Sequence, residues 1–273
     1  MNVIIGGSGR LGQALVRRFG ADAVICLPRA AYADWHADGG ALAVARHFAA
    51  FGPGDTIYVT AGVLDPRAAD ADLAAVNLAL PRNIIDGAAP LGIAVRTFGT
   101  IMETLLSGHN PYIRSKTALG QHVAERAAAG LPVAHVRLHT QYGGGAPSPF
   151  MFLGQIAAAL RTATPFRMTA GKQLREYHHV DDDAAALLAL EQAGLHGAVD
   201  LNHGAPDTLA ALAAHVFSAF DASALLLVGA LPEPAAEHYG GTLIRPAALE
   251  ACAFRASLPG VVDYLRTELQ VPA

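Results

Sequence analysis

The stretch NVIIGGSGRLG, residues 2–12, decides the fold. Its apolar, mostly β-branched start predicts a strand, and a helical pattern begins at Leu11. Between them, Gly6, Gly9 and Gly12 have the spacing G-x-x-G-x-x-G, which permits a tight turn and lets a pyrophosphate approach the backbone. The start of the helix adds N–H donors and a positive dipole end. The stretch therefore predicts a phosphate-binding turn; the alternative is an ordinary strand–helix connection.

The rest of the first half alternates short β-branched runs with alanine-rich helical stretches. This alternation predicts right-handed βαβ crossovers and a parallel sheet covered on both faces. We therefore expect an α/β fold of the Rossmann type, with a doubly wound parallel sheet. The expected strands are Val3–Ile5, Val24–Leu27, Thr56–Thr60, Ile93–Phe98, Val133–Leu138 and Ala198–Leu201, and the expected helices are Leu11–Phe19, Leu42–Phe51, Ala68–Ala88 and Tyr112–Ala129.

The alternation of predicted strands and helices ends after Gln141, where glycines and prolines interrupt it. We predict a dinucleotide-binding core of residues 1–142 and 180–202, and a small substrate-binding lobe of residues 143–179 and 203–273. Within these parts we expect helices over Phe150–Leu160, Asp181–Gln192 and Leu258–Leu269, and an irregular, proline-punctuated remainder.

Composition excludes several classes of protein. The 273 residues are 52% hydrophobic and 15% charged, with mean hydropathy +0.32, which is not the composition of a disordered chain. No apolar run approaches the ~20 residues of a membrane span. A net charge of −4 without a basic run argues against nucleic acid as a partner. Two distant cysteines, Cys26 and Cys252, make no disulfide framework, and the first residues do not form a signal peptide, so we expect a cytoplasmic protein.

The second strand ends at Leu27-Pro28-Arg29, without the carboxylate that holds the adenosine ribose in NAD enzymes. Arg29 can instead hold a 2′-phosphate, with Arg10 adding positive charge. We therefore expect NADP as cofactor, with NAD as the alternative; an ordinary solvated arginine is the other interpretation. The predicted cofactor-binding residues at this point are Gly6, Gly9, Arg10, Leu11, Gly12 and Arg29.

Tyr112 and Lys116 lie four residues apart at the start of a predicted helix, on one face. A tyrosine has a pKa near ~10, and a nearby ammonium lowers that pKa by stabilising the phenolate. The pair is therefore a candidate acid/base unit for alcohol–ketone chemistry, although a surface pair is the simpler alternative. Thr100 ends the fourth strand, where a hydroxyl can polarise a substrate oxygen; Thr97 is the second choice.

Together these residues resemble the short-chain dehydrogenase/reductase superfamily, and within it the extended branch of NAD(P)-dependent epimerases, dehydratases and keto-sugar reductases. The resemblance runs from residue 2 to about residue 202. Thr60-Ala61-Gly62 after the third strand and Asn77 in the next helix are similar to the family's pattern beside the cofactor. RLHTQYG at 137–143 and REYHHVDD at 175–182 resemble two motifs of the extended branch.

The resemblance implies roles for individual residues. Tyr112 would transfer the proton, Lys116 would contact the nicotinamide ribose, and Thr100 would hold the substrate oxygen. Ala61, Gly62 and Asn77 join the cofactor-binding residues, together with Lys116. Arg175 would lie near a substrate phosphate, and His139 and His179 are candidates for substrate contacts. The long helices at about 68–88 and 112–129 imply a homodimer.

Some features depart from the family pattern. The segment between Thr100 and Tyr112 is short, and Thr140 stands where the family has a substrate-binding asparagine. Thr100 is followed by Ile101-Met102-Glu103 and not directly by Asp and Glu, which argues against 4,6-dehydration. His109 and His178 are further candidates for substrate contacts. No histidine or cysteine pairing has the spacing of a metal site, so we expect no metal.

Three functions remain open from the sequence. The leading hypothesis is an NAD(P)-dependent reductase or dehydrogenase acting on a small molecule, for which the resemblance implies a sugar or nucleotide sugar. The second is an epimerase that uses the same residues and retains its cofactor. The third is a protein that binds NAD(P) as a redox sensor without catalysis, against which the intact Tyr112 and Lys116 argue.

Overall fold

A computed structural model of the chain describes residues 1–65, 67–106, 108, 110–234, 237, 240 and 243–271. The chain forms two compact units, the first made of Met1–Leu138 and Leu187–Leu201, the second of His139–Ala186 and Asn202–Ala273. Residues 139–142, 180–186 and Asn202 fall in the second unit, whereas we expected them in the core. For residues 140–142 the reason is that β6 (Thr140–Tyr142) pairs with β9 (Tyr177–His179) and not with the main sheet. The functions predicted for the two parts stay predictions.

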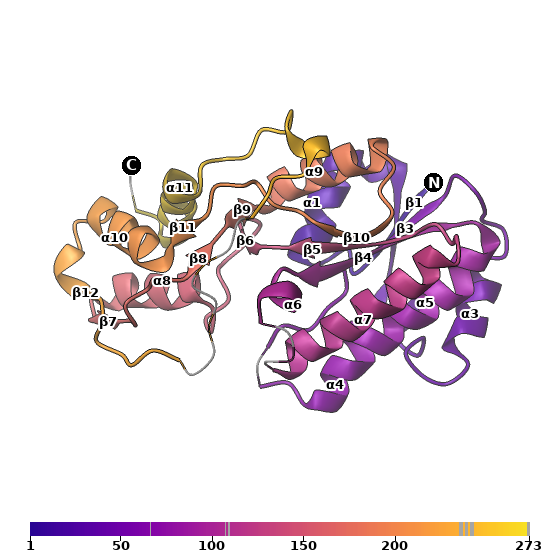
Figure 1. Ribbon diagram of the computed structural model, residues 1–273, viewed down its shortest axis with the longest axis horizontal. Helices are drawn as coiled ribbons and strands as arrows, with labels where there is room; N and C mark the ends of the chain where they lie inside the picture. Colours follow the sequence, from indigo (N-terminus) through magenta and orange to yellow (C-terminus); the bar gives the residue numbers. More distant parts are fainter. Residues whose placement is uncertain are drawn as a thin grey trace. The chain divides into compact units, whose positions relative to one another are not determined.

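A six-stranded parallel sheet with the order β10-β5-β4-β3-β1-β2 forms the centre of the first unit (Figure 1). The predicted Rossmann-type α/β fold is confirmed. The path of the chain across the sheet reverses between β1 and β3, and ligands of such sheets bind at the carboxyl ends of the strands beside this switch point. The strands are β1 (Asn2–Ile5), β2 (Val24–Leu27), β3 (Thr56–Val59), β4 (Ala94–Thr100), β5 (Val133–Leu138) and β10 (Gly197–Asp200).

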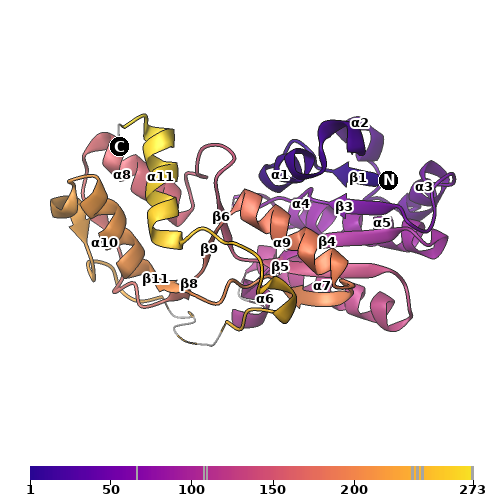
Figure 2. The same cartoon turned by 90° about the horizontal axis from the view of Figure 1, so that it is seen from above.

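Helices cover both faces of this sheet. Figures 1 and 2 show α1 (Arg10–Phe19) and α9 (Val180–Gln192) on one face. The opposite face carries α3 (Gly40–His47), α5 (Leu80–Ala88) and α7 (Pro111–Ala128), whose apolar side chains form one core cluster with the inward residues of the strands. The remaining elements are the short helices α2 (Arg29–Tyr32), α4 (Asp70–Ala74) and α6 (Met102–Leu105) and the 3₁₀ turns η1 (Ala21–Ala23) and η3 (Ala89–Leu91).

The single helix expected over residues 68–88 is interrupted. Between α4 and α5 the backbone forms a π-helical turn, η2 (Ala75–Ala79), centred on Asn77. Pro81 explains the interruption, since it has no N–H to donate to the carbonyl four residues earlier and its ring crowds that carbonyl. Such wide turns recur at functional sites. Here the wide turn holds a predicted cofactor-binding residue.

The second unit has its own core, formed by α8 (Phe152–Thr162), α10 (Leu209–Ala219) and α11 (Ser257–Leu269). We did not predict α10, because we interpreted the region after residue 202 as irregular. Thr208 caps this helix, accepting a hydrogen bond at its Oγ1 from the N–H of Ala211. Short strands complete the unit, with β7 (Phe166–Arg167) paired to β12 (Leu226–Leu227) and β8 (Leu174–Arg175) paired to β11 (Asp207–Thr208); two 3₁₀ turns are η4 (Ser223–Leu225) and η5 (Ala247–Leu249). Among the described residues, no helix has both the length and the apolar character of a membrane span.

A buried ion pair fixes the carboxyl-terminal part of α9 to the sheet of the first unit. Arg96 of β4 donates from Nε and Nη2 to the two carboxylate oxygens of Glu191, at 2.6 and 2.8 Å, and from Nη1 to the carbonyl of Pro132 at 3.1 Å. Its side chain is only 9% exposed. Removing one member of a buried pair leaves the other charge uncompensated.

We expect Glu191→Ala to lower the free energy of unfolding of the first unit by about 3 kcal/mol, because it leaves a buried guanidinium unpaired. Hydrogen exchange of the β4 and β5 amides measures this unit alone. Glu125→Ala, which removes an exposed carboxylate from α7, is the control and should change protection very little. Equal protection in both variants would show that the pair does not stabilise the sheet.

Candidate functional site

The glycine-rich turn lies at the switch point of the sheet. Gly6 has φ +94°, and a Cβ there would collide with the backbone of Ala61. A Cβ at Gly12 would lie 2.5 Å from the carbonyl oxygen of Gly6. At Gly9, in contrast, a Cβ would contact only that oxygen, at 3.3 Å. The inner side of the turn therefore excludes side chains, while its outer side is open to a ligand.

The first turn of α1 has the character of an anion site. Its N-cap is Gly9, with no side-chain hydrogen bond, and its first turn contains no acidic residue. The helix dipole and the first N–H groups are thus not opposed by a carboxylate. Arg10 is half-buried and Leu11 buried at this position. Arg29 is exposed and begins α2 directly after Pro28.

The ends of β1 and β3 are held together by one carbonyl. The oxygen of Ile5 accepts hydrogen bonds from the N–H groups of Thr60 and Ala61, at 2.8 and 2.9 Å, and from Thr60 Oγ1 at 3.1 Å. Ala61 and Gly62 consequently lie beside the glycine-rich turn.

Asn77 is completely buried and shapes the segment after β3. Its amide accepts a hydrogen bond from the N–H of Val63 and donates one to the carbonyl of the same residue, both at 2.9 Å. A Cβ placed on Gly62 would lie 3.4 Å from Asn77 Oδ1 and 3.7 Å from Lys116 Nζ. Three predicted cofactor-binding residues from separate segments thus converge at one point.

Lys116 is anchored on α7. Asn110 is the N-cap of this helix, and its Oδ1 accepts a hydrogen bond from the N–H of Ile113 at 2.9 Å. Lys116 Nζ donates to the carbonyl oxygen of Phe98 at 2.8 Å, so the ammonium is tied to the end of β4. Burial lowers the pKa of Lys116 to about 8, while the negative charge of Glu103 acts in the opposite direction.

Tyr112 lies one turn before Lys116 on the same helix and is half-buried. We expected Lys116 to lower its pKa. The structure shows the opposite direction: burial raises the pKa of the Tyr112 phenol, and the negative charge of Glu103 raises it further. The Lys116 ammonium donates to Phe98. The phenol is therefore protonated at neutral pH, the state of a proton donor.

Thr100 is the last residue of β4, as predicted. Its N–H donates to Glu103 Oε1 at 2.7 Å, and its Oγ1 accepts from the N–H of Met102 at 3.3 Å. The side chain is half-buried at the carboxyl end of the strand. This is the edge of the sheet at which the glycine-rich turn also lies.

Sequence reasoning missed a buried polar chain behind Thr100. Glu103 lies with both carboxylate oxygens 3.2 Å from His135 Nε2, and His135 Nδ1 is 2.8 Å from Thr97 Oγ1. Gly99 leaves the space that these two side chains fill, since a Cβ there would collide with both. One signal was present: His135 interrupts the apolar β5, and a polar residue in a buried strand needs a partner.

The predicted substrate-binding residues lie in the second unit. Arg175 is paired with Glu237 and donates to the carbonyl of Leu174 at 2.8 Å. His179 is half-buried, with its Nδ1 accepting from the N–H of Asp181 at 3.2 Å and its ring 5.2 Å from that of Tyr142. Whether these residues contact a substrate stays a prediction. His109 lies outside the described residues.

His139 and His178 are buried in a network around Glu176. Burial opposes a charge on His178, but Asp183 and Glu176 raise its pKa to about 9. Burial also opposes the charge of Glu176, whereas the hydrogen bond from His178 and the neighbouring imidazoles lower its pKa to about 2. Burial lowers the pKa of His139. Sequence reasoning had named the histidines but not Glu176 or Asp183 as their partners.

Comparison with known proteins identifies the class. The sequence profile of the NAD dependent epimerase/dehydratase family matches residues 2–202. A search of curated proteins returned no significant match. The chain belongs to the NAD dependent epimerase/dehydratase family, which confirms the resemblance seen in the sequence.

Several solved structures share the fold over nearly the whole chain. A dTDP-4-dehydrorhamnose reductase from Clostridium acetobutylicum is 17% identical, with a TM-score of 0.75 and coverage of 99% of this chain and 100% of that one. A dTDP-glucose 4,6-dehydratase from Streptomyces venezuelae, solved with NAD, is 18% identical, with TM-score 0.76 and coverage of 99% and 98%. A UDP-glucose 4-epimerase from Thermus thermophilus, also with NAD, is 17% identical, with TM-score 0.75 and coverage of 100% of both chains.

The pKa of Lys116 is directly measurable, because the chain has only two lysines, Lys116 and Lys172. We expect ¹³C-labelled lysine to give two Cε signals, of which the signal of Lys116 titrates near pH 8. Lys116 therefore loses most of its charge between pH 7 and 9. Glu103→Gln should move this titration to lower pH, since it removes the charge that favours the ammonium.

Lys172→Arg assigns the two signals and should leave the low one in place. A Lys116 signal that does not titrate below the ordinary lysine value of ~10.4 would contradict the burial of Lys116 beside Phe98.

Proposed function

We propose that the chain is an NAD(P)-dependent oxidoreductase that reduces a carbonyl group, or oxidises the corresponding alcohol, with Tyr112 as the acid/base. The observation that carries the proposal is the convergence of Lys116 Nζ, Asn77 Oδ1 and Gly62 beside the glycine-rich turn. This convergence supports a cofactor site and a proton donor at one edge of the sheet. A sensor without catalysis has no need of a buried lysine one turn from a tyrosine.

The residues present fit a bound dinucleotide. The outer side of the turn at Gly9 is open, and the first turn of α1 is free of acidic residues. These features support pyrophosphate binding by Gly6, Gly9, Arg10, Leu11 and Gly12. Ala61, Gly62, Asn77 and Lys116 would border the rest of the cofactor.

The mechanism assigns one task to each side chain. The cofactor, when bound, supplies the hydride chemistry of its nicotinamide. Thr100, at the end of β4, donates a hydrogen bond from its hydroxyl to the substrate oxygen and orients it. Tyr112, kept protonated by burial and by Glu103, donates its proton to that oxygen in the direction of reduction. Lys116, fixed on Phe98, is the positive group that binds the ribose and compensates the phenolate left behind.

The substrate class is proposed from the comparisons. The reductase, dehydratase and epimerase with the same fold are all described as enzymes of nucleotide-linked sugars. We therefore propose a sugar-like carbonyl compound as substrate. Thr140 stands where the family usually has a substrate-binding asparagine. We therefore propose the wider class of sugar-like carbonyl compounds and not nucleotide sugars alone. An epimerase on the same residues is the second candidate, since the family includes this activity.

Retention of cofactor separates the two candidates. A reductase must release its dinucleotide after each turnover, so we expect the purified protein to be largely free of it and to oxidise added NADPH with a carbonyl substrate. Stoichiometric NAD that survives extensive dialysis and appears only on denaturation would favour the epimerase.

Tyr112→Phe tests the assigned acid. The variant keeps the ring but loses the transferable proton, so turnover should fall roughly 10²–10⁴-fold while dinucleotide binding persists. Tyr58→Phe, a buried tyrosine of β3, is the matched control and should keep its activity. Near-normal turnover of Tyr112→Phe would refute the role of this tyrosine.

Arg29→Ala tests the cofactor preference. If Arg29 binds the 2′-phosphate of NADP, the variant should lose about tenfold in NADP affinity, since a charged hydrogen bond contributes at least ~1.5 kcal/mol, and lose nothing for NAD. Quenching of the fluorescence of the single tryptophan, Trp35, reports both titrations. Arg18→Ala, an exposed arginine of α1, is the control. Tighter binding of NAD by the parent, unchanged in the variant, would assign the chain to NAD.

A further inference from the structure

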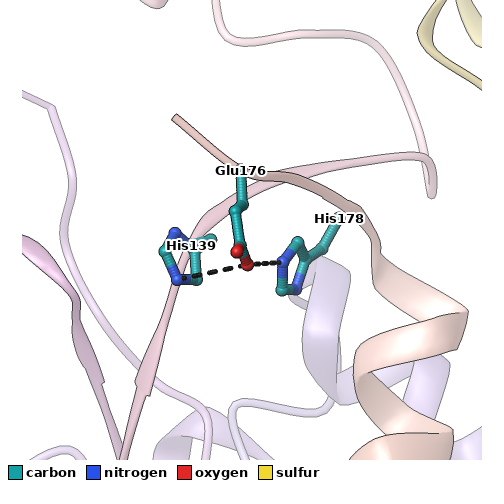
Figure 3. A group of neighbouring side chains, drawn as sticks. All are labelled: His139, Glu176 and His178. Carbon is teal, nitrogen blue, oxygen red and sulfur yellow. Dashed lines mark hydrogen bonds and ion pairs between the residues drawn. The ribbon is translucent and has the colours of Figure 1, made fainter. Parts of the chain in front are cut away.

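A buried group of nitrogen and oxygen ligands forms where β6 and β9 pair in the second unit. The two strands are parallel, with Gln141 opposite His178. His178 lies in β9, Glu176 directly precedes that strand, and His139 directly precedes β6. Figure 3 shows the side chains of His139, Glu176 and His178 pointing toward one another.

The spacing of the three ligand atoms is that of a metal site. Glu176 Oε2 lies 2.9 Å from His178 Nε2 and 3.5 Å from His139 Nε2, and all three atoms lie within 4.8 Å of one another. A tetrahedral zinc ion with bonds of about 2.0–2.1 Å holds its ligand atoms roughly 3.3 Å apart. An ion placed between these atoms therefore requires shifts of only a few tenths of an ångström to about one ångström.

The surrounding groups hold the three ligands in place. Asp183 Oδ1 lies 2.7 Å from His178 Nδ1, and Gln141 Nε2 donates to the other oxygen of Asp183 at 2.6 Å. A carboxylate on the outer nitrogen of a histidine is the usual companion of a metal-binding imidazole, because it fixes the ring and raises its basicity. The carboxylate of Glu176 is oriented by the N–H groups of His203 and Gly204, at 2.7 and 2.8 Å.

Charge balance favours a divalent cation. Glu176 and Asp183 are both buried, and the imidazole of His178 lies between them. The imidazoles of His139 and His203 also face Glu176, at 3.5 and 3.7 Å. Buried carboxylates need positive charge nearby, and a divalent ion bound to Glu176 Oε2 and His178 Nε2 would supply two positive charges for the two carboxylates.

We propose that His139 Nε2, Glu176 Oε2 and His178 Nε2 bind a zinc ion that stabilises the second unit. Imidazole and carboxylate ligands suit zinc, and the burial of all three side chains is the mark of a structural site rather than of one open to substrate. Asn202 Oδ1, 2.7 Å from His139 Nε2, is the available fourth ligand. This site uses no residue of the proposed hydride-transfer reaction. We expected no metal from the sequence, because His139 is 37 residues from Glu176 and no pairing of histidines or cysteines has the spacing of a metal site.

Metal binding is tested on the full chain. After chelation and dialysis, we expect one zinc ion per chain by calorimetry and by elemental analysis after gel filtration, with a higher melting temperature in zinc. Cobalt(II), as a spectroscopic substitute, should give the visible bands of a four-coordinate nitrogen and oxygen site without a thiolate charge-transfer band. A thiolate band would point to Cys26 or Cys252 instead and overturn the proposal.

Variants locate the ligands. His139→Gln and Glu176→Gln should each weaken zinc binding at least 100-fold, whereas His215→Gln, on the exposed side of α10, should bind as the parent does. Stoichiometric binding that survives both ligand variants would overturn the proposal.

Because buried variants can fail to fold, imidazole NMR of the parent gives an independent decision. Zinc should shift the Nε2 resonances of two slowly exchanging histidines. Unchanged imidazole signals at saturating zinc would also overturn the proposal.

Discussion

One carbonyl group, that of Ile5, sets the geometry on which the candidate site depends. It accepts three hydrogen bonds from Thr60 and Ala61 and thereby joins the carboxyl ends of β1 and β3 where the chain reverses direction across the sheet. The ends of the two strands lie so close together that Gly6 has no room for a side chain. The chain turns at this residue with a positive φ, which glycine adopts readily. The turn then presents the open backbone at Gly9 and the first turn of α1 at the same edge as Gly62.

The ionisable side chains of the candidate site lie at the same edge of the sheet, and burial shifts their pKa values. Lys116 loses basicity because it is enclosed beside Phe98, and Tyr112 becomes a weaker acid for the same reason. Glu103 strengthens both protonated states, since its negative charge favours the ammonium and disfavours the phenolate. This carboxylate also accepts from the N–H of Thr100, so one side chain links the position of the threonine to the protonation of the tyrosine.

The sequence predicted what local patterns encode. Strand–helix alternation and the glycine spacing predicted the fold. They also predicted where β4 ends and where α7 begins. It did not predict what depends on contacts between distant segments. The π-helical turn at Asn77 arises from Pro81, and α10 was hidden by the prolines and irregular texture around it. The Glu103–His135 contact joins residues 32 positions apart, and Glu176 lies 37 positions from His139, separations that no spacing rule connects. The expected lowering of the Tyr112 pKa was wrong. The helical spacing showed that Lys116 is near Tyr112, but it showed neither the burial of the tyrosine nor the nearby charge of Glu103.

We propose that the glycine-rich turn binds a dinucleotide in front of Tyr112 and Lys116. Hydrogen exchange of the full chain, measured with and without NADP and NAD, tests this proposal. We expect a dinucleotide to slow exchange of the amides of residues 6–12 and 60–63, next to the turn, and to leave the amides of α10 and α11 unchanged. Exchange in residues 6–12 that does not change at millimolar concentrations of either dinucleotide would refute dinucleotide binding at the turn.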